Sequence, residues 1–198
     1  MLSIKNLTRP GVKSFSLNLK SGECITLTGP SGAGKTLLLR AIADLDPNQG
    51  SVFLNKVDRN DFAAPDWRRA VGYLPSESGW WGDHVGSHFP NQENARVLLP
   101  KLDIHPDALD WPVAQLSTGE RQRLALVRLL TVSPKVMLLD EPTSGLDVQS
   151  EALVEKVLIE YLERGNAILL VTHSVDQVRR LSIQQFHMQA GFVSEVLV

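Results

Sequence analysis

A glycine-rich octapeptide at residues 29–36 constrains this chain more than any other stretch. Its sequence, GPSGAGKT, matches the phosphate-binding pattern G-x-x-x-x-G-K-[ST] at every defined position. Glycines let backbone N–H groups wrap a polyphosphate, Lys35 adds positive charge, and the Thr36 hydroxyl can bind Mg²⁺. A strand-like run over 23–28 precedes the loop, and an apolar helical pattern over 37–42 follows it. The stretch therefore predicts a nucleoside triphosphate site formed by Gly29, Pro30, Ser31, Gly32, Ala33, Gly34, Lys35 and Thr36.

Strand and helix patterns alternate along most of the chain, which indicates an α/β fold with a parallel sheet and crossover helices. Helices are expected after Ser117, whose spacing to Glu120 predicts a capping box, and over 148–163. A hairpin is expected across 190–191 into Phe192–Leu197. Other strands are expected at 2–7 and 14–19, which alternate apolar and polar residues, and at 51–54, 71–74, 136–140 and 167–172.

Residues 76–115 differ from the rest of the chain in composition and in pattern. They hold three of the four tryptophans and four prolines and show no strong strand pattern, so we expect a small inserted helical subdomain. The remaining ranges, 1–75 and 116–198, then form one catalytic core, a P-loop NTPase fold with antiparallel strands near its amino terminus. His84 and His88 are spaced as a metal-binding pair can be, but no third ligand follows in pattern, which favours two surface histidines.

Composition narrows the class of partner. A net charge of −2 lacks the basic surplus of most nucleic-acid-binding proteins. The first residues do not resemble a signal peptide, and no window reaches the roughly 18 apolar residues of a membrane span. Cys24, the single cysteine, is expected to be a small buried hydrophobe and suits a reducing cytosol. Any function at a membrane is therefore expected to depend on a partner.

Four later stretches carry a family resemblance. Residues 116–120 (LSTGE) resemble the LSGGQ signature of ATP-binding cassette (ABC) ATPases, and 138–143 (LLDEPT) resemble their Walker B strand. Residues 144–147 (SGLD) are similar to the D-loop, and 171–174 (VTHS) to the stretch that carries the switch histidine. Together with the phosphate loop, their order and spacing make the chain resemble ABC ATPases over nearly its whole length.

The chemistry of these residues agrees with the resemblance. Asp140, at a strand end, can hold Mg²⁺ through oxygen, and Glu141 can orient or deprotonate water. His173 also follows an apolar strand and can donate to a γ-phosphate. Ser117 and Gly119 head a helix, where a hydroxyl, backbone N–H groups and the helix dipole favour an anion.

The resemblance implies an ATPase subunit of a transporter, with Lys35, Glu141 and His173 as catalytic residues and with ATP and Mg²⁺ as ligands. It also implies a head-to-tail homodimer that encloses two ATPs and drives a separate membrane permease from the cytoplasmic face. Two alternatives are a soluble ABC ATPase that acts on nucleic acid or ribosomes and a weakly hydrolysing, nucleotide-dependent regulator. No nucleic-acid partner is expected.

Within that implied dimer, Ser117 and Gly119 contact the ATP of the opposite subunit. Asp147, in the D-loop, connects the two sites. The resemblance to the family implies both of these roles; the residues of this chain alone do not indicate them.

The chain departs from the family at three places. Ser76 stands where the family has a glutamine that reaches Mg²⁺, so either water fills the gap or the metal is held less firmly. Arg9 stands where an aromatic usually stacks on adenine, and it is expected either to stack on the base or to be a solvated surface arginine. The insert is also short for the family. These departures favour slow turnover.

Trp80 and Trp81 follow Ser76 and are flanked by glycines. In the family, the groove beside this loop receives a helix of the membrane subunit. Exposed aromatics suit such a contact, and we expect the permease to dock near these residues. The alternative is that both indoles pack in the chain's own core.

Overall fold

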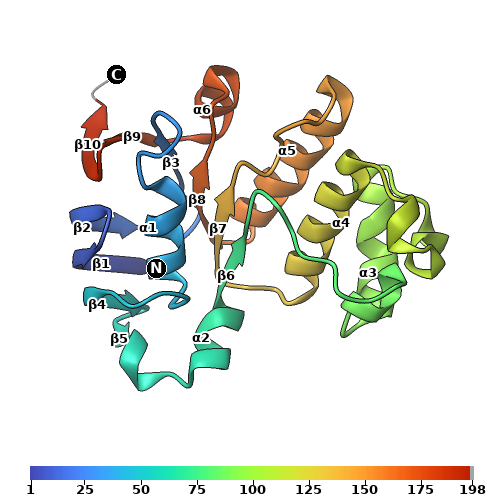
Figure 1. The fold of residues 1–198 in the computed structure, drawn as a ribbon, viewed down its shortest axis with the longest axis horizontal. Coiled ribbons are helices and arrows are strands. Elements are labelled where there is room, and N and C mark those ends of the chain that lie inside the picture. Colours follow the sequence, from blue (N-terminus) through green and yellow to red (C-terminus); the bar gives the residue numbers. More distant parts are fainter. Residues whose placement is uncertain (197–198) are drawn as a thin grey trace.

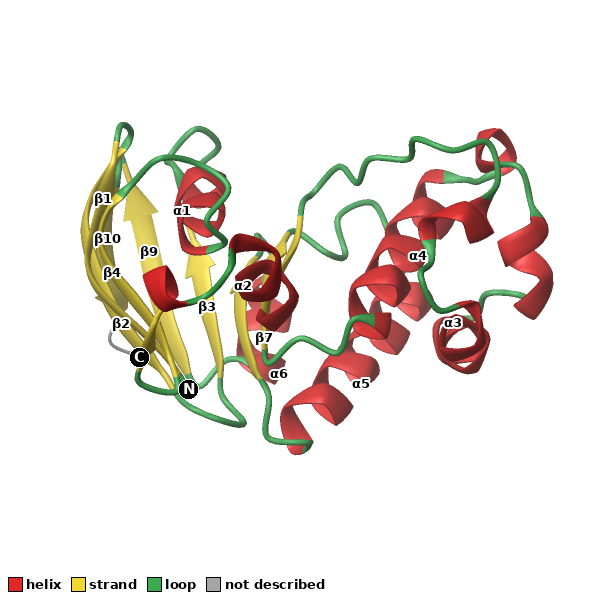
Figure 2. Cartoon of the chain, turned by 90° about the horizontal axis from the view of Figure 1, so that it is seen from below, coloured by secondary structure: helices red, strands yellow, loops and turns green. Residues whose placement is uncertain are grey.

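The computed structural model describes residues 1–196, which form two sheets with a helix between them (Figures 1 and 2). The first sheet is antiparallel and has the spatial order β2 (Val12–Leu19), β1 (Leu2–Arg9), β4 (Gln49–Leu54) and β5 (Val57–Asp58). The second has the order β10 (Phe192–Val196), β9 (Gln184–Gln189), β3 (Cys24–Thr28), β8 (Ala167–Val171), β7 (Val136–Asp140) and β6 (Val71–Leu74).

All neighbouring strands from β9 to β6 run parallel, and only β10 pairs antiparallel, with β9. The predicted α/β fold, with antiparallel amino-terminal strands and a parallel sheet, is therefore confirmed. The predicted hairpin across 190–191 is also present, although Leu197, the last residue expected in it, lies outside the described residues.

The parallel strands are apolar because both of their faces are covered. Every residue of β7 and β8 is buried. Side chains alternate between two cores: Leu138 and Leu169 pack with α1 (Lys35–Ile42) and the first sheet, whereas Met137 and Leu139 pack with the helices on the opposite face. Cys24 is buried in the second of these cores, as expected.

The helices of the second core are α4 (Thr118–Thr131), α5 (Val148–Glu163) and, in part, α6 (Val175–Leu181) and α3 (Gln92–Leu98). Helix α2 (Ala64–Ala70) leads into β6. Short 3-10 turns span Arg59–Asp61, Val85–His88, Leu99–Leu102, Pro106–Asp110 and Val113–Gln115.

Residues 76–115 are helical and looped, and they pack against α4 and α5 at the end of the molecule away from the first sheet (Figure 2). That they form a separate subdomain stays a prediction. The prediction that both histidines lie at the surface is wrong for His88. His84 is exposed, but His88 is only 3% exposed, and its Nε2 contacts the backbone of Gly82.

No helix within residues 1–196 is both long enough and apolar enough to cross a bilayer.

Trp67 offers a direct test of the first core. It is fully buried, and its Nε1 donates to the Ile42 carbonyl at 3.0 Å. We expect Trp67→Phe to lower the free energy of unfolding by about 2–3 kcal/mol, because it leaves a void and an unpaired carbonyl. Trp81→Phe, at a residue that is 75% exposed, is the matched control and should shift stability by less than about 0.5 kcal/mol in urea unfolding. Equal shifts in the two variants would contradict this packing.

Candidate active site

The glycine-rich loop connects β3 to α1 at the carboxyl edge of the parallel sheet. Two of its glycines are required by close packing. Gly29 has φ +141°, and a Cβ there would lie 2.1 Å from the carbonyl oxygen of Met188 on β9. Gly34 has φ +108°, and a Cβ there would lie 2.8 Å from the carbonyl oxygen of Gly11. The loop therefore follows a path that only glycine permits at these two positions.

A cavity of about 290 Å³ opens over the loop and is lined by residues 31–37 and Glu141. Lys35 is buried beside it, and its Nζ donates to the carbonyls of Gly29 at 2.7 Å and Pro30 at 3.0 Å. Burial lowers the pKa of Lys35, and the nearby carboxylates of Glu141 and Asp140 oppose that shift. The Lys35 ammonium group therefore lies at the amino end of α1, where backbone N–H groups also favour binding of an anion.

Asp140 and Thr36, the two predicted metal ligands with the strongest sequence support, are in contact. Asp140 ends β7 and is only 2% exposed, and its Oδ2 accepts from Thr36 Oγ1 at 2.7 Å and from Tyr73 Oη at 3.4 Å. Burial raises the pKa of Asp140, whereas the Thr36 hydrogen bond lowers it. A carboxylate and a hydroxyl beside a phosphate loop are the oxygen donors that Mg²⁺ prefers, so the residues present fit this ion.

Glu141 and His173 form a pair at the same sheet edge. His173 Nε2 lies 3.1 Å from Glu141 Oε1, and both side chains are partly exposed. They meet because β7 and β8 are adjacent and parallel, with Asp140 opposite Val171. Glu141 has φ +53°, an unfavourable conformation for a residue other than glycine.

Two hydrogen bonds hold the backbone of Glu141 in that conformation. Its N–H donates to the Val171 carbonyl at 2.9 Å, and its carbonyl accepts from Gln122 Nε2 at 2.8 Å. Gln122 lies on α4 and was missed by sequence reasoning. The sequence places Gln122 in the helix that begins after Ser117. No pattern in the sequence indicates that Gln122 contacts Glu141, which lies 19 residues further along the chain.

Ser117, Gly119 and Asp147 lie apart from the phosphate loop, and none of them lines its cavity. Ser117 caps α4, and the predicted capping box is confirmed: its Oγ accepts from the Glu120 N–H at 3.2 Å, and Glu120 Oε2 accepts from the Ser117 N–H at 2.8 Å. The Ser117 hydroxyl also donates to Glu120 Oε2 at 2.7 Å, and this bond, together with the one from the Ser117 N–H, lowers the pKa of Glu120. Asp147 caps α5 and accepts from the N–H and Oγ of Ser150, both at 2.9 Å.

The structure contradicts one of the two sequence alternatives for Arg9, the solvated surface arginine, and stacking on adenine stays a prediction. Its side chain is only 14% exposed, so it is not a solvated arginine, and its Nη1 contacts Asp46 Oδ2 at 2.5 Å. Asp46 also accepts from Arg40 on α1, at 2.7 and 2.9 Å. Hydrogen bonds from Arg40 and then Arg9 hold the pKa of Asp46 well below its usual range. The guanidinium of Arg9 is thus engaged in an ion pair that connects β1 to α1.

Ser76 is exposed in the bend after β6 and makes no side-chain hydrogen bond within residues 1–196. The Ser76 side chain therefore makes no hydrogen bond to Asp140 or Thr36, the two predicted metal ligands that do meet.

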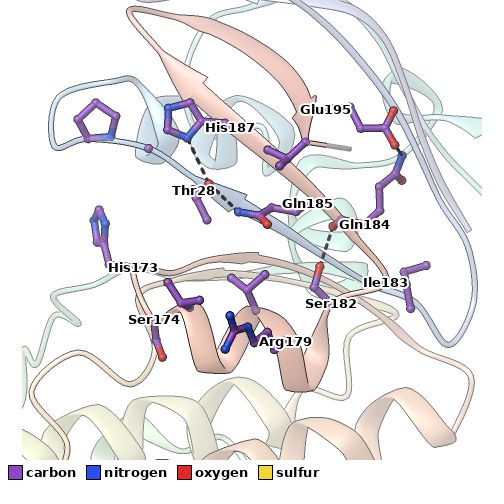
Figure 3. A pocket seen from close by; sticks show the side chains of 15 residues that line it. Thr28, His173, Ser174, Arg179, Ser182, Ile183, Gln184, Gln185, His187 and Glu195 are labelled. Atoms are coloured by element: carbon purple, nitrogen blue, oxygen red, sulfur yellow. Dashed lines mark hydrogen bonds between the residues drawn. The ribbon is translucent and has the colours of Figure 1, made fainter. Parts of the chain in front are cut away.

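A larger groove of about 1000 Å³ lies between α6 and β9, next to Gly29 and Pro30 (Figure 3). His173 stands on one side of it, and Thr28 and His187 on the other. Thr28 Oγ1 contacts His187 Nδ1 at 3.4 Å and accepts from Gln185 Nε2 at 3.3 Å. Sequence reasoning did not find this groove, because residues distant in the chain form it and no motif covers them.

Comparison with known proteins gives consistent results. A family model described as ABC transporter matches residues 12–144. The chain is 35% identical to the sulfate/thiosulfate import ATP-binding protein CysA of Mesorhizobium japonicum, over 94% of this chain and 59% of that protein. It is 33% identical to Protein STAR1 of Oryza sativa subsp. japonica, over 94% of this chain and 57% of that protein. The chain thus spans somewhat over half the length of these two curated relatives.

Aliphatic sulfonates import ATP-binding protein SsuB 1 of Shouchella clausii is 32% identical, over 92% of this chain and 73% of its own length. Among solved structures, a bacterial Atm1-family ABC exporter with ATP bound superposes with a TM-score of 0.83. It is 21% identical and covers 98% of this chain and 38% of the exporter chain, so it establishes a shared fold.

The ion pair of Arg9 gives a second test. We expect Asp46→Ala to lower the free energy of unfolding by about 2–3 kcal/mol, because it leaves the largely buried Arg9 guanidinium unpaired. Asp66→Ala removes an exposed carboxylate that pairs with Arg69 at 3.1 Å, and it should cost less than about 0.5 kcal/mol. Chemical denaturation of both variants measures the difference. Comparable losses would show that the Asp46 cluster contributes no more than a surface pair.

Proposed function

Because this chain belongs to the ABC transporter family, we propose that it binds ATP and hydrolyses it to drive a separate membrane permease. The observation that best supports hydrolysis is the Glu141–His173 pair, 3.1 Å apart, beside a phosphate loop and a buried carboxylate. A loop that only bound nucleotide would need neither side chain.

The phosphate loop binds the polyphosphate of ATP. Lys35 Nζ now donates to two loop carbonyls, and phosphate oxygens are stronger acceptors for the same cation. Backbone N–H groups at the amino end of α1 add further donors. Thr36 and Asp140 would hold Mg²⁺, which neutralises charge on the β- and γ-phosphate oxygens when it is bound.

Glu141 accepts a proton from the attacking water or orients it, and His173 donates to the γ-phosphate. The backbone of Glu141 is fixed by bonds to Val171 and Gln122, so its carboxylate starts from a defined position. A Glu141 backbone held in one conformation supports catalysis, because the water must be oriented before it reacts.

A second copy of the chain completes the site. Ser117 and Gly119 head α4, where a helix end favours an anion, yet neither lines the cavity of its own phosphate loop. A head-to-tail homodimer places them on the ATP of the opposite subunit, and Asp147 connects the two sites. Ser76 is proposed to lie on the metal side and, with its short side chain, to hold Mg²⁺ weakly.

The permease docks at the loop after β6, near Ser76 and Trp81. Trp81 is 75% exposed, which suits contact with a partner, whereas Trp80 is half-buried and packs against the chain's own second core. The proposed docking contact therefore rests on Trp81. Through this partner the chain lies on the cytoplasmic face of the membrane.

Glu141→Gln is expected to keep ATP binding and to lower phosphate release by at least about 100-fold, because an amide cannot take a proton from water. Gel filtration with ATP should show the variant as a dimer. Glu163→Gln, an exposed residue at the end of α5, is the matched control and should keep the activity of the parent chain. Undiminished phosphate release by Glu141→Gln would reject the proposed role of this carboxylate.

Trp81→Ala is expected to release the chain from its permease while leaving its melting temperature nearly unchanged, because the indole is mostly exposed. Trp80→Ala should instead lower the melting temperature, since its ring packs against the second core. Co-purification with a co-expressed membrane permease, together with a melting curve for each variant, measures both effects. Retention of Trp81→Ala on the permease would refute docking through this residue.

A further inference from the structure

Tyr73 is one of only two tyrosines in the chain, and strand pairing directs it toward the metal-site carboxylate. On β6, Val71 and Tyr73 pack with the first core, whereas Leu74 packs with the second. Tyr73 lies opposite Leu138 of β7, two residues before Asp140, and Leu138 faces the same core. Because side chains two residues apart share a face of a strand, Tyr73 and Asp140 lie on the side of the sheet that α1 covers.

Two hydroxyls converge on one oxygen of Asp140. Tyr73 Oη lies 3.4 Å from Oδ2, and Thr36 Oγ1 lies 2.7 Å from the same atom. Oδ1 receives no hydrogen bond from any side chain among residues 1–196. The two donors come from β6 and α1, so they approach Asp140 from different elements. A carboxylate held at one oxygen by two such donors has little freedom to rotate and keeps the lone pairs of Oδ1 available.

Packing also limits the movement of Tyr73. The ring is half-buried against the first core, which fixes the direction of the O–H group.

We propose that Tyr73 is a positioning residue that orients the Asp140 carboxylate for a nucleotide-bound divalent cation. The inference rests on the proposed function, since it concerns the metal of the same site. Tyr73 acts through Asp140 and contacts neither nucleotide nor water itself. Its loss should weaken binding of the cation without weakening binding of the nucleotide alone.

Tyr73→Phe removes one oxygen and keeps the ring. Tyr161→Phe is the matched control, because Tyr161 is buried and its hydroxyl donates to the Pro134 carbonyl at 2.8 Å, away from the nucleotide cavity. Each variant is titrated with Mn²⁺ in the presence of ADP, and free Mn²⁺ is measured by electron paramagnetic resonance. ADP binding in EDTA is measured separately.

We expect Tyr73→Phe to weaken Mn²⁺ binding roughly three- to tenfold, which corresponds to the usual net contribution of one hydrogen bond, with ADP binding in EDTA unchanged. Tyr161→Phe should bind Mn²⁺ like the parent chain and only melt at a lower temperature. Parent-like Mn²⁺ binding by Tyr73→Phe, or equal weakening with and without metal, would overturn the proposal. A parent chain that binds no Mn²⁺ with ADP would instead overturn the proposed function, and this inference with it.

Discussion

The parallel pairing of β3, β8 and β7 is the interaction on which the rest of the structure depends. Carboxyl ends of adjacent parallel strands meet at one edge, so the phosphate loop, Asp140 with Glu141, and His173 all leave the sheet on the same side. The pairing brings together residues that are more than 100 positions apart in the chain. Because these strands are buried on both faces, a shift in their register would move side chains into the opposite core and disrupt close packing on both sides.

Buried charges on both sides of this sheet are paired, which limits how its helices can move. On one side, Asp46 joins Arg9 of β1 to Arg40 of α1. On the other side, Glu155 of α5 is only 6% exposed and accepts from Arg180 of α6 at 2.6 and 2.8 Å. Breaking either pair would leave a buried charge without a partner, which costs far more than losing a surface pair. Both helices that follow site loops, α1 and α6, are thereby held to their neighbours.

Most of the fold and the location of the candidate site could be predicted from short stretches, because each motif joins a strand to a turn of defined chemistry. The phosphate loop and the capping box at Ser117 are local patterns, and the structure has both as expected. Contacts between distant segments could not be predicted. Arg9 meets Asp46 37 residues away, and Gln122 meets Glu141 across two elements, with no pattern that indicates either pairing. His88 was placed at the surface because periodicity does not show which loop residues the packing covers.

In the proposed homodimer, the phosphate loop of one chain and the α4 end of a second chain form a single hydrolytic site. Phosphate release from ATP, measured per chain over a wide range of chain concentrations, tests it most directly. We expect the rate per chain to rise with concentration as dimers form and then to reach a plateau. A rate per chain that is independent of concentration, down to dilutions where gel filtration with ATP shows only monomers, would contradict it.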